Sequence, residues 1–468
     1  MRSISILVRS LIAFSRLAFA LAFYRKDEGK LDIAGYRFRK YFEQTGGMFV
    51  KFGQIISLRR DLLPVPICNQ LSKLLDEVPP FAFDRVEELF QQYHGKQTSE
   101  LFAEFDPQPI GSASMGQVYK AKLKSGEKVA VKILRPHIRA QVESDMRLIR
   151  IVAVVADFLS PLTRIPLSEL AREFGMWVQE ETDYEQEAQN LEDFYDKKTA
   201  LLPLFQIPSK IRLPGLYKEL CTPEILVMEF IDGITVSKLI SYVQHHDESK
   251  LAELKAQGYD FNAISRTISL LVMKQYFIDG YFNADPHPAN IIVTPEQEIV
   301  FIDFGLVGRL DRKNRLAAFR FFRSLTLLEG ETAYKALLIL MDIEEDKGGK
   351  LHRAMMKMVK QLQQSRDAGE VNYKDNSTQA LFNLVRILYT SRIKIPPSTA
   401  KALRAMANTD GIVHGLTPDV TFEEATQDVL RVALAATYIN LKETLTEQSL
   451  TKLLIKGIGI FEEQVMDL

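Results

Sequence analysis

Residues 284–305 read ADPHPANIIVTPEQEIVFIDFG, and this stretch decides the fold that we expect for the chain. Asp285 and Asn290 stand five positions apart, and Asp303 opens an Asp-Phe-Gly triplet thirteen positions after Asn290. The apolar runs at 291–293 and 299–302 predict two short strands on either side of a turn. The triplet alone is a weak signal, whereas its distance from the Asp–Asn pair and its place behind a strand are specific.

This spacing resembles the active site of kinases. In such a site, one Asp faces the accepting hydroxyl group, and the Asn and the Asp of the triplet hold the magnesium ion that bridges the ATP phosphates. Asp285 is therefore the candidate catalytic residue, and Asn290 and Asp303 are the candidate metal ligands, with ATP and Mg²⁺ as the expected cofactors. The alternative, an acidic loop between two strands, has to be weighed against the residues upstream.

A loop of small residues, PIGSASMGQVY at 109–119, lies upstream and leads into a strand. Its small residues follow the spacing of the G-x-G-x-x-G phosphate loop, with Ala in the middle position. Small side chains let backbone N–H groups approach phosphate, although a middle Ala restricts positive φ and shifts the nucleotide. We expect ATP contacts from Gly111, Ser112, Ala113, Ser114, Gly116, Gln117 and Val118.

Lys132 ends the next predicted strand, VAVK at 129–132. A lysine in this position pairs with the α- and β-phosphates and needs an acidic partner on a following helix. Glu187 is the best candidate for that partner. A plain hairpin with a surface lysine could explain either the loop or Lys132 taken alone. It does not explain the two occurring together at this spacing.

The apolar run at 224–233 predicts a strand followed by a hinge between two lobes. In kinases the adenine base binds to hinge backbone groups, which correspond here to the carbonyl of Glu229 and the N–H of Ile231. An edge strand followed by a turn is the alternative.

Further motifs resemble the UbiB/AarF/ADCK family of atypical kinases over about residues 40–310. They occur in the family's order: Lys51-Phe52-Gly53-Gln54, then Ser57, Arg59 and Asp61-Leu62-Leu63-Pro64, then Asp76-Glu77-Val78-Pro79-Pro80, then Glu181-Thr182-Asp183-Tyr184 with Glu187, Ala188 and Asn190, and finally Ala284-Asp285-Pro286-His287-Pro288.

The resemblance implies a gated active site. In the family, the lysine of the KxGQ motif reaches into the kinase site and blocks the space for a protein substrate, while the E-x-D pair engages this extension. Carried over, Lys51 and Gln54 form the gate with Glu181 and Asp183, and Lys51 joins Lys132 and Asp285 at the catalytic centre.

The resemblance also implies a function: Mg-ATP binding with ATP hydrolysis or phosphoryl transfer, in support of isoprenoid-quinone (ubiquinone-type) lipid biosynthesis. Quinone-pathway lipids or enzymes would then be partners. Two departures from the family pattern stand out, because many members have His at position 283 and Gly at position 289. Asn283 can still form hydrogen bonds, so we expect altered support of the catalytic loop, and Ala289 removes backbone freedom beside a metal ligand.

We expect an α+β, bilobal protein-kinase-like fold with a helical KxGQ extension before it and a helical C-terminal region after it. The expected parts are a basic amphipathic helix at 1–30, the KxGQ extension at 31–105, the N-lobe at 106–228, the catalytic part of the C-lobe at 229–330 and a helical C-terminal part at 331–468.

Three rival functions stay open. A conventional protein kinase is disfavoured by the KxGQ motif and by the lack of an Ala-Pro-Glu triplet. A small-molecule kinase of the aminoglycoside-phosphotransferase type would keep the core without this extension. A non-catalytic lipid-binding scaffold would be expected to lose Lys132, Asp285 or Asp303, and all three are present.

The N-terminus is strongly basic. Residues 1–60 hold twelve Lys or Arg and four Asp or Glu, although the whole chain has a net charge of −1. Arg2, Arg9 and Arg16 recur every seven residues and share one helical stripe, which suits a helix lying on anionic lipid. Packing against the kinase core, a signal peptide and a mitochondrial transit peptide are the alternatives.

We therefore expect a cytoplasmic, peripherally membrane-associated bacterial protein, or alternatively a mitochondrial one, without a nucleic-acid partner. The sequence leaves its oligomeric state open. Charges interrupt every apolar run, so we expect no bilayer-spanning segment. Two cysteines, Cys68 and Cys221, are too few for a disulfide framework.

Overall fold

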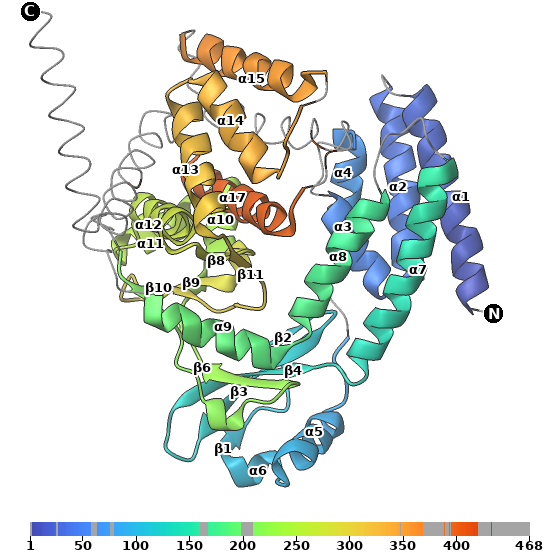
Figure 1. The fold of residues 1–468 in the computed structure, drawn as a ribbon. Helices are drawn as coiled ribbons and strands as arrows, with labels where there is room; N and C mark the ends of the chain where they lie inside the picture. The colour runs from blue at the N-terminus through green and yellow to red at the C-terminus, as the bar shows by residue number, and fades with distance from the viewer. Residues whose placement is uncertain are drawn as a thin grey trace, which may run out of the picture.

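The computed structural model of the chain describes residues 2–24, 27–57, 63–74, 79–159, 167–197, 209–346, 348–367, 388, 393, 395–419 and 432. A strand-rich N-lobe and a mainly helical C-lobe lie on either side of helix α9, and a stack of long helices stands beside them (Figure 1). The predicted α+β, kinase-like fold is confirmed.

The N-lobe is built on a five-stranded antiparallel sheet in the order β1-β3-β4-β6, with β2 paired to β3. Its strands are β1 (Phe102–Phe105), β2 (Gly111–Ser112), β3 (Gly116–Leu123), β4 (Lys128–Leu134) and β6 (Ile225–Glu229). The predicted hairpin of β3 and β4 aligns Val118 with Lys132. Directly paired residues share a face of the sheet, so Val118 and Lys132 face the same side.

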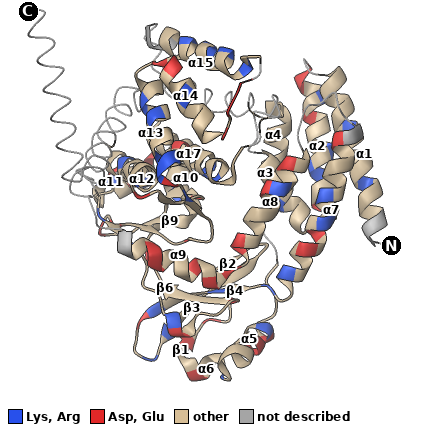
Figure 2. Ribbon diagram, viewed as in Figure 1, with Lys and Arg blue, Asp and Glu red and all other residues tan. Residues whose placement is uncertain are grey.

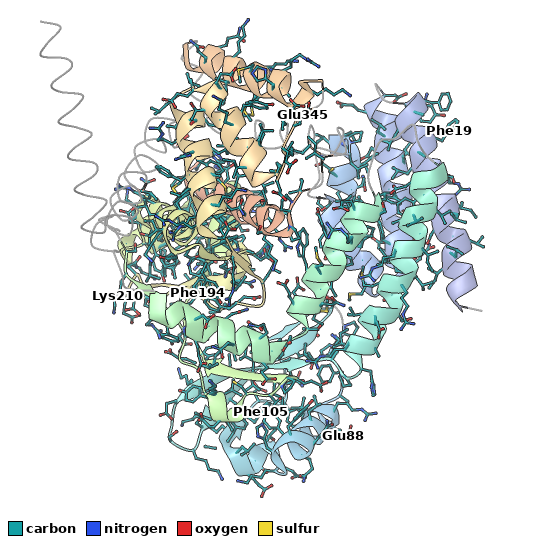
Figure 3. The ribbon with its side chains drawn as sticks, in the orientation of Figure 1. Phe19, Glu88, Phe105, Phe194, Lys210 and Glu345 are labelled. Carbon is teal, nitrogen blue, oxygen red and sulfur yellow. The ribbon has the colours of Figure 1, made fainter. Side chains whose placement is uncertain are left out.

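Two helices cover the other face of this sheet, namely α5 (Asp84–His94) and α6 (Thr98–Leu101). Phe90 of α5 packs with Tyr119 and Val131 in one buried cluster, and its ring lies edge-on to Phe102. Figure 3 shows Phe105 at the end of β1 in the same region. Of the residues that we grouped with the extension, 84–101 thus lie against the N-lobe sheet and 102–105 form its strand β1.

The helical extension packs as one layer with two helices inserted before α9 (Figure 1). These elements are α1 (Arg2–Phe23), α2 (Glu28–Thr45), α3 (Met48–Ser57), α4 (Val65–Leu71), α7 (Ile138–Leu159) and α8 (Leu167–Glu181). Gly53 lies where α3 meets its neighbours most closely, since a β-carbon there would come within 2.7 Å of the Phe42 ring and 2.6 Å of Leu74. The glycine of the KxGQ motif is therefore required by packing, which fixes the helix that carries Lys51.

Helix α9 (Tyr184–Lys197) crosses between the lobes (Figure 1). The Asp183 side chain accepts a hydrogen bond from the Gln186 N–H at 3.1 Å and so caps the helix. Phe194 lies near the opposite end, and its ring centroid is 5.1 Å from that of Phe304 and 4.7 Å from that of Tyr281 (Figure 3). The helix is thus fixed against the segment that carries the Asp-Phe-Gly triplet.

The C-lobe combines two small sheets with helices. Its strands form the order β5-β10-β9-β7 and the pair β11-β8: β5 (Ile211–Arg212), β7 (Ile234–Thr235), β8 (Tyr281–Asn283), β9 (Ile291–Val293), β10 (Ile299–Phe301) and β11 (Val307–Arg309). Its described helices are α10 (Val236–Gln244), α11 (Glu248–Ala256), α12 (Phe261–Lys274), α13 (Arg312–Thr326), α14 (Gly330–Leu340), α15 (Lys350–Asp367) and α17 (Pro397–Leu416).

Three short helical turns complete the described elements: η2 (Lys218–Leu220), the π-helical η3 (Gln275–Asp279) and η4 (Pro288–Asn290). The antiparallel pair β9–β10 confirms the two strands predicted around the turn. It places Asn290 directly before β9 and Asp303 two residues after β10.

Helix α1 is amphipathic in its packing. Its buried residues face α2 and α7, whereas Val8, Ile12, Phe19 and Phe23 are exposed. Figure 3 shows Phe19 at the outer edge of the helical layer, and Figure 2 marks the basic positions along α1, α2 and α7.

We expected no segment able to span a bilayer, but the Ser5–Phe23 part of α1 is long and apolar enough to do so by length and composition. Packed core helices and signal sequences share that property, so it does not by itself place α1 in a membrane.

Gly308 of β11 offers a test of the packing behind the site. A β-carbon there would overlap the ring of Phe282, which is fully buried. We expect Gly308→Ala to destabilise the protein by about 1–3 kcal/mol, the usual range for overpacking a core. Gly411→Ala is the matched control, because a β-carbon at this exposed position in α17 meets no atom within 4 Å. It should stabilise by roughly 0.5–1 kcal/mol through helix propensity. Equal urea-denaturation midpoints for the two variants would contradict this account.

Candidate functional site

A buried ion pair connects the two lobes. Lys132 Nζ on β4 lies 2.7 Å from Glu187 Oε1 on α9, and the two side chains are 13% and 6% exposed. The same ammonium donates to the carbonyl of Ile302 at 3.0 Å, and the same carboxylate oxygen accepts from the Phe304 N–H at 3.2 Å. Three segments that are distant in sequence therefore meet at one pair of charges.

Electrostatics keep this lysine charged. Burial opposes the ammonium form of Lys132, but the nearby carboxylates of Glu187 and Asp303 outweigh it and raise the pKa of Lys132. Burial also raises the pKa of the Glu187 carboxyl, against the lowering effect of Lys132. The raised pKa favours the ammonium form of Lys132, so its positive charge lies beside the triplet and is balanced by the Glu187 carboxylate.

Asp303 and Asn290 lie together at the end of β10. Asp303 accepts one hydrogen bond from the Gly305 N–H at 3.0 Å and another from Asn290 Nδ2 at 3.0 Å. One carboxylate and one amide oxygen suit Mg²⁺, which prefers few protein ligands and completes its shell with phosphate and water. The described residues contain no cluster of three or more His, Cys, Asp or Glu with metal-binding geometry. Asn290 and Asp303 stay the candidate magnesium ligands because their side chains lie together.

Asn283 links the catalytic loop to the triplet. Its amide donates to the carbonyl of Asp303 at 2.8 Å and accepts from the Asp285 N–H at 2.9 Å. It is 2% exposed. This neutral residue thus supports the loop through two hydrogen bonds, as its chemistry led us to expect. Asn190 of α9 adds a similar link by donating to the Phe304 carbonyl at 2.9 Å.

Asp285 is held by a helix from much later in the chain. Arg404 Nη2 donates to Asp285 Oδ2 at 2.6 Å, and Asn408 Nδ2 donates to Asp285 Oδ1 at 2.7 Å. Burial has the largest effect on the pKa of Asp285 and raises it. The positive groups Arg404 and His287 lower this pKa, and the carboxylates of Glu181 and Asp303 raise it further. Arg404 is therefore the main group that favours the ionised form of this carboxylate.

The predicted phosphate loop forms the turn between β2 and β3, closed by a hydrogen bond from the Ala113 N–H to the Gly116 carbonyl at 2.9 Å. A β-carbon on Gly116 would clash with the carbonyl of Ile133, whereas one on Gly111 meets no atom within 4 Å. Neither glycine has positive φ. Close packing therefore explains Gly116, and the structure imposes no steric need for glycine at position 111.

Arg135 fixes this loop by hydrogen bonds. Its guanidinium donates to the carbonyl of Ala113 at 2.8 Å and to Ser112 Oγ at 2.9 Å, and its N–H donates to the Met115 carbonyl at 2.9 Å. The Arg135 side chain thus fixes Ser112 and Ala113, and its backbone fixes Met115, although the motif did not single out this residue.

The loop residues do not all face the lysine. Val118 pairs with Lys132 and shares its face, but Gln117 pairs with Ile133 on the opposite face. The Gln117 side chain is 1% exposed and accepts a hydrogen bond from the Tyr119 hydroxyl. Gln117 can therefore approach a nucleotide through its backbone, while its side chain belongs to the core under α5.

The expected hinge follows β6 directly. Ile231 is buried and packs with Ile292 and Val300 from β9 and β10, so the connection between the lobes carries a small apolar cluster. The Glu229 side chain accepts from Arg212 Nη1 at 2.5 Å and from the Gly215 N–H at 3.1 Å. Its carboxylate is thus used structurally, and its backbone N–H donates to the Gly215 carbonyl at 2.7 Å, so the expected adenine contact falls to its backbone carbonyl.

The expected gate is partly assembled. Lys51 of α3 forms an ion pair with Glu181 at the end of α8, and both side chains are largely buried at 16% and 22% exposure. Gln54 instead donates to the carbonyl of Leu74 at 3.1 Å. Asp183 is exposed and caps α9. The structure thus brings Lys51 and Glu181 together and gives Gln54 and Asp183 supporting contacts.

Several known proteins are similar to this chain in sequence. A Clostridium pasteurianum protein from the 5′ region of hydrogenase 1 is 30% identical over 384 residues, which cover 82% of this chain and 68% of that protein. A Synechocystis protein is 29% identical over 376 residues, covering 80% and 88%. The probable protein kinase UbiB of Tolumonas auensis is 35% identical over 286 residues, covering 60% of this chain and 49% of its own length.

Among solved structures, the Mycobacterium tuberculosis protein Rv3197, determined with erythromycin, has a similar fold. Its TM-score is 0.50 at 20% sequence identity, over 78% of this chain and 84% of that one. A model of the ABC1 atypical kinase-like domain matches residues 73–337, more than half of the chain. The chain belongs to the ABC1 atypical kinase-like family.

Proposed function

We propose that this protein binds Mg-ATP between its lobes and acts as an atypical kinase or ATPase. The observation that carries the proposal is the buried Lys132–Glu187 pair, joined by hydrogen bonds to the residues on both sides of Asp303. A charged lysine fixed beside a carboxylate and an amide is a binding site for phosphate and its counterion. The kinase-like family supports nucleotide binding in general.

In this proposal each element has a role. The adenine base lies against Ile231 and the backbone of Glu229, and the phosphates lie under the loop from Gly111 to Val118. Lys132 binds the α- and β-phosphates. Mg²⁺, held by Asn290 and Asp303, would neutralise charge on the terminal phosphates. Asp285 orients the accepting hydroxyl group or a water molecule.

The gate limits what can be phosphorylated. Lys51 pairs with Glu181, and Glu181 is close enough to Asp285 to raise its pKa. An extension in this place leaves little room for a peptide beside Asp285. We therefore favour a small-molecule acceptor or water over a protein substrate.

The relatives and helix α1 support a proposal for the pathway and the cellular location of this protein. The UbiB relative and the family resemblance support a role in isoprenoid-quinone lipid biosynthesis. The exposed apolar residues of α1 lie among Arg9 and Arg16, which are also exposed. Apolar and basic residues on one surface suit contact with an anionic membrane, so we place the protein at a membrane surface.

The metal assignment is tested by Asp303→Asn. A neutral amide replaces the carboxylate, so magnesium-dependent ATP affinity should fall by on the order of tenfold or more. Isothermal calorimetry with and without Mg²⁺ measures this. Asp260→Asn is the matched control, because Asp260 only caps α12 through the Ala263 N–H and Asn caps equally well. Tight Mg-ATP binding by the Asp303 variant would refute the assignment.

The gate is tested by comparing two lysines. Lys51→Ala should keep or tighten ATP binding and permit autophosphorylation, because it removes the obstruction and strands Glu181. Lys132→Ala should lose ATP affinity directly, because it removes the phosphate-binding charge and strands Glu187.

Affinity titration and labelled-phosphate incorporation separate the two lysine variants. Lys128→Ala on the same strand is the control, since Lys128 is exposed and pairs with Asp232 at the surface. If the Lys51 and Lys132 variants both lost ATP and neither autophosphorylated, Lys51 would be an ordinary fold or phosphate contact.

Membrane contact is tested by reversing Arg2, Arg9 and Arg16 to Glu. Binding to anionic vesicles should weaken by about 1 kcal/mol for each basic residue removed from the surface, and the remaining binding should depend less on salt. Vesicle flotation at low and high salt measures both effects. The control reverses three exposed lysines elsewhere, Lys96, Lys124 and Lys255, for the same change in net charge. Equal flotation of both triple variants would rule out a docking role for the α1 stripe.

A further inference from the structure

Helix α17 reaches Asp285 with two donors on one face. Arg404 and Asn408 are four residues apart, one helical turn, and each donates to a different oxygen of the Asp285 carboxylate, at 2.6 and 2.7 Å. The carboxylate is thereby held in one orientation. Two hydrogen bonds still leave lone pairs on the two oxygens for a hydroxyl group or a water molecule, so the contact positions Asp285 without blocking it.

Arg404 has donor capacity left over. Its Nη2 binds Asp285, but its other terminal nitrogen, Nη1, is buried and has no hydrogen-bond partner in the described part of the chain. The guanidinium plane is also held in place, because its central carbon lies 4.8 Å from the centroid of the Trp177 ring. A fixed, buried and unpaired cationic donor is costly unless a ligand satisfies it.

The surroundings show which ligand fits. The sequence from Pro286 to Ala289, between the catalytic Asp and the metal-binding Asn, contains no Lys or Arg. Lys132 approaches from the N-lobe side, beside Glu187 and Ile302. Among the described residues, Arg404 is the arginine that forms an ion pair with Asp285, and we expect the terminal phosphate of a bound nucleotide beside this aspartate. Guanidinium groups bind phosphate oxygens through two nitrogens.

We propose that Arg404 binds the terminal phosphate of the nucleoside triphosphate through Nη1, while Nη2 keeps Asp285 oriented toward the acceptor. This inference rests on the proposed function, since it assigns a further residue to the same nucleotide site. It makes Arg404 the group that distinguishes a triphosphate from a diphosphate, because only the triphosphate carries an oxygen at that position.

Lys401 provides a matched control on the same helix. Its Nζ donates to Glu180 Oε1 at 2.7 Å and to the Val307 carbonyl at 2.9 Å, so it docks α17 against α8 and β11. Lys401 has no hydrogen bond to Asp285 among these contacts. Loss of α17 docking should therefore follow from changing either residue, whereas loss of triphosphate recognition should follow only from changing Arg404.

The experiment measures Mg-ATP and Mg-ADP affinity by calorimetry in the full chain, for the parent and for Arg404→Met, Arg404→Lys and Lys401→Met. Methionine keeps an unbranched apolar stem against Trp177 and removes the charge. Arg404→Met should weaken ATP binding about tenfold to a hundredfold, the loss expected for one charge-assisted hydrogen bond, with ADP binding changed by less than about threefold. Arg404→Lys should keep the fold and recover part of the ATP affinity.

Two results would overturn the inference. One is parallel loss of ATP and ADP by Arg404→Met and Lys401→Met, which would make Arg404 a docking residue only. The other is unchanged ATP affinity in both Arg404 variants. Failure of the proposed function looks different, because the parent itself would then bind neither nucleotide, or Lys132→Ala would bind ATP as the parent does.

Discussion

The rest of the site depends on the buried carboxylate of Glu187. It pairs with Lys132 from β4 and accepts the Phe304 N–H from the triplet, so it fixes α9, the N-lobe sheet and the C-lobe loop at once. A charge buried to this extent is stable only when it is paired and hydrogen-bonded. Removing Lys132 would therefore cost both the connection between the lobes and the charge that we propose binds phosphate. The apolar contacts of Phe194 with Phe304 hold the same junction from the other end of α9.

Much of this arrangement could be predicted from short motifs, because those motifs lie on consecutive strands and turns. The strands around 291–302, the β3–β4 hairpin and the acidic partner on a following helix all follow from local patterns. The contacts of Arg404 and Asn408 with Asp285 could not be predicted, since they span more than a hundred residues and depend on how α17 packs. The hydrogen bonds that Arg135 donates to the carbonyls of Ala113 and Met115 also depend on tertiary packing.

Two features of the arrangement could not be predicted from the motifs alone. Gln117 lies inside the phosphate-loop pattern, yet the strand register turns its side chain away from Lys132. Residues 84–105 follow the KxGQ extension in sequence, yet Phe90 and Phe102 pack with the N-lobe sheet. The alternation of side chains along a strand decides which way Gln117 faces. Burial against a sheet decides where residues 84–105 pack. A list of motif residues contains neither kind of information.

The central claim is that nucleotide lies between β4 and the triplet, with its phosphates on Lys132. A crystal structure with Mg²⁺ and a non-hydrolysable ATP analogue tests it most directly. We predict phosphate oxygens in contact with Lys132 Nζ, the metal between Asn290 and Asp303, and the adenine base beside Ile231. An analogue bound elsewhere, or a site that stays empty at saturating concentration while the Lys132–Glu187 pair is intact, would contradict the account.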